Sequence, residues 1–452
     1  MKRIIIYLSI IAILFSNIQY VQGEEENKKI VEATATYPEA PEINGHSAVL
    51  IDIDTGAILY SKNPHEKMYP ASITKIMTTL LAVENLAMED TFTFSQDILN
   101  ALPWDAAKYG YVAGEEVGIR DLIYVLMLRS ANEVAMGLAM KIAGSEEEFA
   151  KLMTAKAKEI GAVNTNFVNA TGLHDDNHYT TAYDMALIAL EAMDNSTFAE
   201  VWGNPSYIVN PTSVEPDVVR IWNRHNMLVS RQAAYYSYAK GGKTGYTDEA
   251  GRTLVTYASR DGRNLMCVVM KSGTETVYDD TRRLFEYGFT EFQNIEVKGN
   301  ETRFGQSENS FFVSRDNLFS GSSNLMELTD SYVTIPVGSS IDSLGYELTF
   351  LENDKNGYVA NIKYMIGDAY LGETSLKLSA NDGDDEDKLP YKEEETEPIK
   401  KQEELPINVY MVMGIIVAII VLVIVIKIIR KTSGKRKAKR ARKKLFKNNK
   451  LH

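Results

Sequence analysis

Apolar and polar residues alternate near both ends of the first 290 positions of the chain. Residues 46–63 predict two strands joined around Asp54-Thr55-Gly56, because alternating segments flank a turn that contains glycine. Residues 252–272 predict a second hairpin, with Asp261-Gly262 as its turn signal. Both pairs are expected to be antiparallel, since a tight turn reverses the direction of the chain.

Apolar residues recur at helical spacing between and after these two hairpins. The pattern covers residues 72–85, most of 93 to about 200, and 278–292. Strands therefore begin and end this part of the chain, and helices lie between them. The pattern predicts an α/β (α+β) fold, in which helices cover one antiparallel sheet and a helical subdomain is inserted in its middle.

The remaining segments differ in composition. Residues 24–42 are expected to be a polar lead-in, and residues 291–380 show short alternating runs that predict a small β-rich domain. Residues 381–405 contain eleven acidic residues, four lysines and two prolines. Such a segment buries little apolar surface, so we predict a solvated acidic linker over 381–406.

The N-terminus has the pattern of an export signal. Lys2 and Arg3 precede an apolar run, Ile4–Phe15, that is too short to span a bilayer. Small residues suited to cleavage precede Glu24. We therefore predict a signal peptide over residues 1–23.

The C-terminal region predicts a membrane anchor. Val409–Ile426 is eighteen residues long without a charge, and thirteen Lys and Arg follow within residues 427–452. The sequence predicts a transmembrane helix over 407–429 and a basic cytoplasmic tail over 430–452, because cationic flanks stay in the cytoplasm. The expected location is the cell membrane, single-pass, with the rest of the mature chain outside the cytoplasm.

Charge excludes one class of partner. Residues 24–406 carry 33 Lys and Arg against 61 Asp and Glu, a net charge of −28. Nucleic-acid affinity depends on cationic contacts to phosphate, so this part of the chain is not expected to bind nucleic acid. The single cysteine, Cys267, lies in an apolar run and is expected to be a packed, inert thiol.

The stretch YPASITKIMTTL contains the first candidate for chemistry. Ser72 and Lys75 are three residues apart, so a helix places both on one face. Serine is a weak nucleophile until a base takes its proton, and lysine serves as that base only when burial or a cation favours its neutral form. Taken alone, such a pair is more often two exposed helix residues.

Two further motifs interrupt apolar segments. Ser130 and Asn132 stand between two helical stretches, where they could relay a proton and hold an amide, or simply cap a helix. Lys243-Thr244-Gly245 precedes an apolar strand, where lysine supplies charge and glycine permits close backbone approach. A glycine-rich turn is the alternative for this third motif.

The order S-x-x-K, S-x-N, K-T-G resembles the signature of penicillin-recognising serine enzymes. With segments such as NTNFVNATGLHDDNHYTTAYDMALIA and RRLFEYGF, residues 40–290 are similar to the serine-type D-alanyl-D-alanine carboxypeptidases. These are the low-molecular-mass penicillin-binding proteins of peptidase family S11. The resemblance implies a β-lactamase/transpeptidase-like fold and no metal or organic cofactor.

The resemblance also implies roles for individual residues. Ser72 would attack the carbonyl between the two terminal D-alanines of a peptidoglycan stem peptide, with Lys75 as general base. Ser130 and Lys243 would relay a proton, and Asn132 and the Thr244–Gly245 region would hold the peptide. Backbone N–H groups of Ser72 and Tyr246 would bind the oxyanion. β-Lactam antibiotics would inhibit by acylating Ser72.

Three features depart from related patterns. The middle motif is S-A-N, and no E-x-x-L-N follows it, which favours a carboxypeptidase over a class A β-lactamase. Carboxypeptidases of this kind often carry an arginine for the substrate carboxylate where this chain has Tyr278. The sequence leaves Lys243, Lys271 or Arg282 as substitutes.

Other functions remain open from the sequence. A D-Ala endopeptidase or a β-lactamase could use the same scaffold, and a catalytically silent wall-binding protein is a third alternative. The stretch GLHDDNHY contains His174, Asp175, Asp176 and His178, which could bind a metal. A polar loop without metal is the interpretation we prefer for it.

Overall fold

The computed structural model describes residues 28–304, 326–351 and 357–378. One five-stranded sheet in it has the order β3-β2-β10-β9-β8, and every neighbouring pair is antiparallel. Its strands are β2 (Ser47–Asp52), β3 (Ile58–Lys62), β8 (Ala239–Thr247), β9 (Gly251–Arg260) and β10 (Arg263–Ser272). The antiparallel sheet expected from the sequence is therefore confirmed.

Both predicted hairpins are present. In the first, Gly56 adopts a φ of 72°, and in the second Asp261 and Gly262 adopt φ of 52° and 83°. These left-handed conformations suit glycine and aspartate, which is why the turns could be found from the sequence. All six residues of β2 are buried, as expected for a strand covered on both faces.

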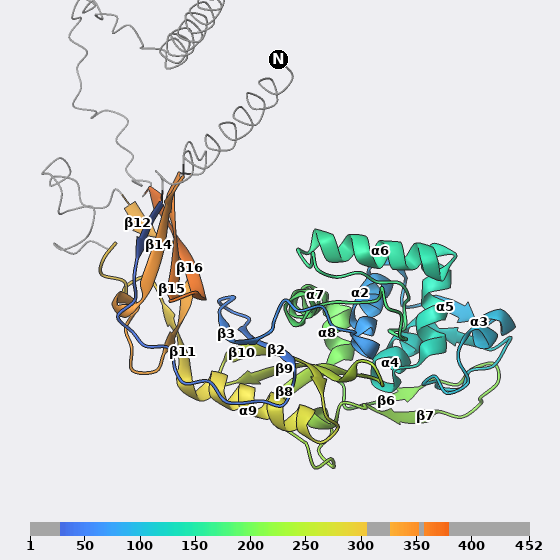
Figure 1. Cartoon of the computed structure of the whole chain (residues 1–452). Coiled ribbons are helices and arrows are strands. Elements are labelled where there is room, and N and C mark those ends of the chain that lie inside the picture. Colours follow the sequence, from blue (N-terminus) through green and yellow to red (C-terminus); the bar gives the residue numbers. More distant parts are fainter. Residues whose placement is uncertain (1–27, 305–325, 352–356, 379–452) are drawn as a thin grey trace, which may run out of the picture. The chain divides into compact units, whose positions relative to one another are not determined.

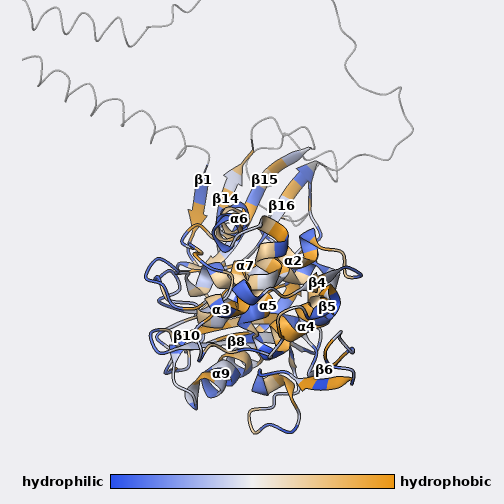
Figure 2. Cartoon of the chain, turned by 90° about the vertical axis from the view of Figure 1, so that its right-hand side faces the viewer, coloured by the Kyte–Doolittle hydropathy of each residue, from blue (hydrophilic) through white to orange (hydrophobic). Residues whose placement is uncertain are grey.

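Helices cover the two faces of this sheet. Helix α9 (Thr276–Glu291) packs on one face, and the helices of the inserted region lie against the other (Figure 1). In Figure 2, α9 carries both hydrophilic and hydrophobic residues, as an amphipathic helix on a sheet requires. The other helices are α2 (Lys75–Asn85), α3 (Gln96–Ala101), α4 (Ile119–Arg129), α5 (Asn132–Ala143), α6 (Glu146–Glu159), α7 (Ala182–Asp194) and α8 (Ser196–Trp202).

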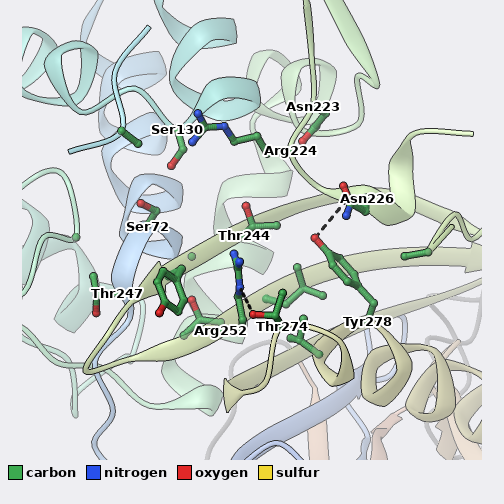
Figure 3. A pocket seen from close by; sticks show the side chains of 18 of the residues that line it. Ser72, Ser130, Asn223, Arg224, Asn226, Thr244, Thr247, Arg252, Thr274 and Tyr278 are labelled. Carbon is green, nitrogen blue, oxygen red and sulfur yellow. Dashed lines mark hydrogen bonds between the residues drawn. The ribbon is translucent and has the colours of Figure 1, made fainter. Parts of the chain in front are cut away.

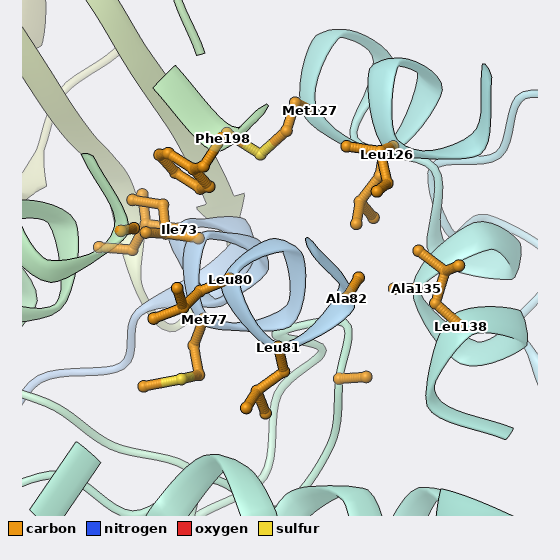
Figure 4. Close-up of a cluster of buried hydrophobic side chains, with 14 of the residues drawn as sticks. Ile73, Met77, Leu80, Leu81, Ala82, Leu126, Met127, Ala135, Leu138 and Phe198 are labelled. Atoms are coloured by element: carbon orange, nitrogen blue, oxygen red, sulfur yellow. The ribbon is translucent and has the colours of Figure 1, made fainter. Parts of the chain in front are cut away.

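Helix α2 is the centre of the larger hydrophobic core. Met77, Leu80 and Leu81 radiate from it toward surrounding helices (Figure 4). Leu126 and Met127 of α4, Ala135 and Leu138 of α5, and Phe198 of α8 lie around the same helix and belong to the same core. All eight side chains are at most 6% exposed, so the helix that follows Ser72 has little freedom to move.

A second five-stranded sheet combines one strand from the N-terminal stretch with four strands from the β-rich region. Its order is β1-β14-β15-β16-β12, and β11 pairs separately with β13. The strands are β1 (Lys28–Val31), β11 (Phe292–Glu296), β12 (Met326–Leu328), β13 (Tyr332–Pro336), β14 (Gly345–Phe350), β15 (Tyr358–Ile366) and β16 (Ala369–Leu378). The β-rich character expected for 291–380 is present, whereas the domain boundaries themselves stay predictions.

The lead-in differs from the expectation. Lys28–Val31, within the expected polar lead-in, is an edge strand that pairs antiparallel with β14, about 320 residues later. Four residues that alternate in burial give too short a pattern to identify a strand, and their partner is distant in the sequence. Two short two-stranded sheets were also not predicted: β4 (Thr91–Thr93) with β5 (Glu116–Gly118), and β6 (Ser206–Val209) with β7 (Val219–Trp222).

Cys267 is fully buried in β10 and has no disulfide partner. The prediction of a packed thiol is thus confirmed, and burial raises the pKa of the thiol, as expected for an unreactive cysteine. The expected signal peptide, acidic linker, transmembrane helix and basic tail lie outside the described residues. Within the described ranges, the helices are all too short or too polar to cross a membrane.

Candidate active site

Ser72 lies in a short 3₁₀ turn, Ala71–Thr74, directly before α2. Lys75 begins α2, and its Nζ lies 3.1 Å from Ser72 Oγ. Ala71 precedes the serine with a φ of 50°, a conformation that an L-residue rarely adopts. The turn thus aims the serine into a cavity while its lysine neighbour stays buried.

Lys75 is fully buried and has three oxygen neighbours. Besides Ser72 Oγ, its Nζ lies 2.7 Å from Asn132 Oδ1 and donates a hydrogen bond to the carbonyl oxygen of Thr171. A neutral amine has two N–H bonds and one lone pair. The two carbonyl acceptors occupy the N–H bonds, which leaves the lone pair for the hydroxyl of Ser72.

The surroundings of Lys75 favour this neutral form. Burial lowers the pKa of Lys75 well below its usual value, and the nearby cations of Lys243 and Arg224 lower it further. Glu133 acts in the opposite direction but does not outweigh burial. The amine is therefore suited to accept a proton at pH values where an exposed lysine is already charged.

Ser130 occupies the break between α4 and α5 in a left-handed conformation, with a φ of 62°. Its backbone N–H closes α4 by donating to Leu126 O, and its side chain accepts a hydrogen bond from Lys243 Nζ at 3.1 Å. Lys243 also donates to Thr244 O at 2.8 Å. Ser130 thus ends α4 and faces the site, but the N-cap considered as the alternative is not formed, since Ala131 precedes the first residue of α5 and makes no side-chain cap; the relay role stays a prediction.

Gly245 allows β8 to approach the serine turn closely. A Cβ there would lie 2.9 Å from Ser72 N, 3.0 Å from Pro70 O and 2.3 Å from Thr253 Oγ1. The Thr253 hydroxyl donates to Pro70 O at 2.8 Å and holds the turn against the sheet. A side chain at position 245 would separate the strand from the serine, so the K-T-G glycine has a steric reason.

The segment Asn169–Gly172 is a part of the site to which the sequence analysis assigned no role. Asn169 Oδ1 accepts hydrogen bonds from Thr171 N at 3.1 Å and Gly172 N at 2.7 Å, and this folds the loop. A Cβ on Gly172 would lie 1.9 Å from Ala71 O. This segment contributes the backbone carbonyl of Thr171, which accepts a hydrogen bond from Lys75. Every residue type has such a carbonyl, so the sequence gives no signal for it.

His178 lies behind the serine turn, where both of its ring nitrogens make hydrogen bonds. Its Nε2 is 2.8 Å from Thr74 Oγ1, and its Nδ1 accepts from Val168 N at 3.0 Å. Burial lowers the pKa of His178 to about 4, so the ring is neutral near pH 7. Within the described residues, no group of three metal-binding side chains gathers, His174, Asp175 and Asp176 included.

These motifs border one cavity of about 1140 Å³ (Figure 3). Ser72, Ser130, Asn132, Thr244 and Gly245 all line it. Tyr246 lines it too and is 50% exposed. The structure thus brings together the catalytic and substrate-binding residues that the sequence proposed. Lys75 and Lys243 are buried behind the cavity wall and are hydrogen-bonded to Ser72 and Ser130. The catalytic roles of all these residues stay predictions.

The three cations considered for the substrate carboxylate lie in different places. Lys243 is engaged with Ser130 and Thr244, as described above. Arg282 lines the cavity, but its guanidinium donates to the carbonyl oxygens of Ala234 and Tyr235. Lys271 is exposed and is not among the residues that line the cavity.

Burial of Lys243 predicts a pH-dependent stability. Burial and Arg224 lower the pKa of Lys243 to about 7, against 10.5 for a free lysine. The unfolded chain therefore binds more protons between these two pH values, and the destabilisation due to Lys243 fades as pH rises from about 7 to 10.5. We expect the unfolding free energy of the native chain, relative to that of a Lys243→Met variant, to rise by up to about 1.4 kcal/mol per pH unit in this window.

Denaturant titrations of the two proteins at matched pH values measure this difference. Groups common to both proteins, such as the buried tyrosines, cancel in the comparison. A difference that stays flat from pH 7 to 10 would mean that Lys243 keeps an ordinary pKa in the folded chain.

Comparisons with known proteins agree with this geometry. Residues 34–274 match the peptidase S11 family of D-alanyl-D-alanine carboxypeptidases. The chain is 32% identical over 293 residues to D-alanyl-D-alanine carboxypeptidase DacF of Bacillus subtilis, covering 63% of this chain and 70% of that protein. It is 27% identical over 356 residues to DacA of Haemophilus influenzae, covering 76% and 83% respectively.

Solved structures show the same fold. A D-alanyl-D-alanine carboxypeptidase from Mycobacterium tuberculosis superposes with a TM-score of 0.51 at 28% identity, covering 57% of this chain and 96% of that one. Penicillin-binding protein 5 from Haemophilus influenzae superposes with a TM-score of 0.61 at 24% identity, covering 75% and 98%. The second similarity concerns the fold alone.

The family match spans more than half of the chain and includes all three motifs that line the cavity. A serine beside a buried lysine whose pKa is lowered by burial is also the arrangement that a serine hydrolase needs. This chain therefore belongs to the peptidase S11 family of serine-type D-alanyl-D-alanine carboxypeptidases.

Proposed function

We propose that this chain removes the terminal D-alanine from peptidoglycan stem peptides through an acyl-enzyme on Ser72. The observation that carries the proposal is the pair of contacts Ser72–Lys75 and Ser130–Lys243, both 3.1 Å, in one cavity. One pair can activate a hydroxyl, and the other can deliver a proton to a leaving amine. An ordinary binding protein has no need for two buried lysines bonded to serines.

Acylation begins with proton transfer from the Ser72 hydroxyl to Lys75 Nζ. The oxygen then attacks the carbonyl carbon between the two D-alanines, and charge develops on the carbonyl oxygen. The backbone N–H groups of Ser72 and Tyr246 lie where β8 approaches the serine turn, and they are our candidates for the oxyanion hole. Asn132, bonded to Lys75, can also hold a peptide amide.

Collapse of the tetrahedral intermediate breaks the C–N bond. Ser130 gives its proton to the departing amine and regains one from Lys243. Lys243 is then reprotonated with the proton that Lys75 took from Ser72. D-Alanine leaves, and the peptide stays as an ester on Ser72. Water then attacks this ester, with Lys75 as the base, and restores the free serine. Ser72–Lys75 and Ser130–Lys243 are the two hydrogen-bonded pairs on this route, and the proton transfer from one pair to the other is part of the proposal.

We also propose that penicillins acylate Ser72 and that the chain acts outside the cytoplasm, attached to the membrane by residues 407–429. The support for attachment is the uncharged run Val409–Ile426 with its basic flank. Protease added to intact protoplasts should then remove the catalytic region and spare the C-terminal tail.

Three assays of the full-length chain purified in detergent test the reaction. The first measures D-alanine release from a pentapeptide ending in D-Ala-D-Ala, the second cleavage of a cross-linked dimeric peptide, and the third turnover of benzylpenicillin. We expect D-alanine release to be the fastest, and benzylpenicillin to label the chain at one equivalent with slow release. Faster cleavage of the dimer would identify an endopeptidase, rapid penicillin turnover a β-lactamase, and no activity or labelling a silent wall-binding protein.

A further inference from the structure

A carboxypeptidase must recognise the free carboxylate of the residue that it removes. This inference rests on the proposed function. In the proposed mechanism the leaving D-alanine lies past the scissile bond beside Ser130, which protonates its amine. Lys243 is hydrogen-bonded to Ser130, so the strand that carries Lys243 and Thr244 borders the same part of the cavity. A guanidinium close to Thr244 would bind the carboxylate with charge and with paired N–H donors.

Five arginines line the cavity, and two of them are engaged with other groups of the protein. Arg282 donates to two backbone carbonyls, and Arg231 stacks on the ring of Trp222 at 3.8 Å. Figure 3 shows Arg224 beside Ser130, and Arg252 beside Thr244. The arginines of the cavity wall are Arg129, Arg224, Arg231, Arg252 and Arg282.

Arg252 belongs to β9, the strand that pairs with the K-T-G strand β8. Arg252 lies opposite Tyr246, and Leu254 lies opposite Thr244. Paired residues of antiparallel strands share a face, so Thr244, Tyr246 and Arg252 project to the same side of the sheet. Thr244 is then a diagonal neighbour of Arg252, at a separation that a long side chain can cross.

The guanidinium of Arg252 is held in place but not neutralised. Its Cζ lies 4.6 Å from the centre of the Tyr246 ring, and its Nε donates to Thr274 Oγ1 at 3.3 Å. Among the described residues, no carboxylate lies within 4.0 Å of its nitrogen atoms. Its terminal N–H groups thus remain available to a ligand in a cavity of an otherwise acidic protein.

Tyr278 lies on the far side of Thr274 and has no positive charge with which to bind a carboxylate. Its hydroxyl accepts a hydrogen bond from Asn226 N at 3.5 Å, and its ring packs against His225. Burial raises the pKa of Tyr278, so the phenol stays neutral. A tyrosine in this state cannot form an ion pair with a carboxylate.

We propose that Arg252 binds the C-terminal carboxylate of the substrate, together with the Thr244 side chain, and so determines specificity for a free C-terminus. The cation for this subsite therefore comes from β9, whereas Tyr278 stands near the start of α9.

The test compares two peptides that differ only at the C-terminus: one ending in D-Ala-D-Ala and the same peptide as its C-terminal carboxamide. We expect the native chain to prefer the free acid in kcat/KM by at least about 30-fold. Arg252→Gln should reduce this preference to less than about threefold, mainly by slowing cleavage of the acid. Arg252→Lys should keep part of it, because the charge remains while the planar paired contact is lost.

Lys271→Gln is the matched control, since it removes one positive charge from the adjacent strand outside the cavity. It should leave the acid-to-amide ratio unchanged. An Arg252→Gln variant that keeps the native ratio, or a Lys271→Gln variant that loses it, overturns the assignment. If the native chain cleaves neither peptide, the proposed function fails instead, which is a separate result.

Discussion

Replacing Ser72 with alanine should reduce D-alanine release by at least about 10⁴-fold and abolish covalent labelling by benzylpenicillin. The reason is that the acyl-enzyme needs an oxygen at this position, and Lys75 Nζ, 3.1 Å away, would have no hydroxyl to deprotonate. Loss of the nucleophile leaves only binding and oxyanion stabilisation, which give a small residual rate. Intact-mass measurement after incubation with the antibiotic detects the ester directly.

Folding of the Ser72→Ala variant can be checked independently. Among the described residues, Ser72 Oγ makes one hydrogen bond, with Lys75 Nζ, so its loss should cost about 1 kcal/mol or less of stability. Ser237→Ala is a suitable control because Ser237 is exposed and does not line the cavity. A folded Ser72→Ala variant that still gained the mass of the antibiotic would assign the nucleophile to another residue, with Ser130 the nearest candidate.

The second large effect is expected for Lys75→Met, which replaces the buried amine with an apolar side chain of similar length. Acylation by benzylpenicillin should slow by about 10³-fold, within the range that a positioned general base contributes. The slowing should appear in the acylation rate constant, since Ser72 itself is unchanged. Stopped-flow measurements with a fluorescent penicillin resolve this step.

Stability separates a catalytic from a structural effect in this variant. Methionine leaves Asn132 Oδ1 and Thr171 O without the donor that Lys75 supplies, which costs stability, while the penalty for burying an amine disappears. The net change in Tm should therefore be small. Lys62→Met is the control, because Lys62 donates to Ile43 O at 2.9 Å outside the cavity. Acylation by folded Lys75→Met within tenfold of the native rate would transfer the role of base to Lys243, acting through Ser130.

Much of the fold could be predicted from the sequence because its signals are local. The turns Asp54-Thr55-Gly56 and Asp261-Gly262 contain the residues that left-handed backbone requires, so both hairpins were found. The periodicity of residues 72–85 likewise marked α2. The strand Lys28–Val31 was missed because its partner, β14, is remote in the sequence and only pairing reveals it.

The candidate site divides in the same way. The residue types that could do chemistry are visible in the sequence, since Ser72, Lys75, Ser130 and Lys243 occur in motifs of fixed spacing. The burial of the two lysines results from folding, and this burial lowers their pKa values. The carbonyl of Thr171 and the orientation of Arg252 were likewise decided by folding. A backbone atom and a side-chain direction depend on which segments pack together, and no single segment encodes that.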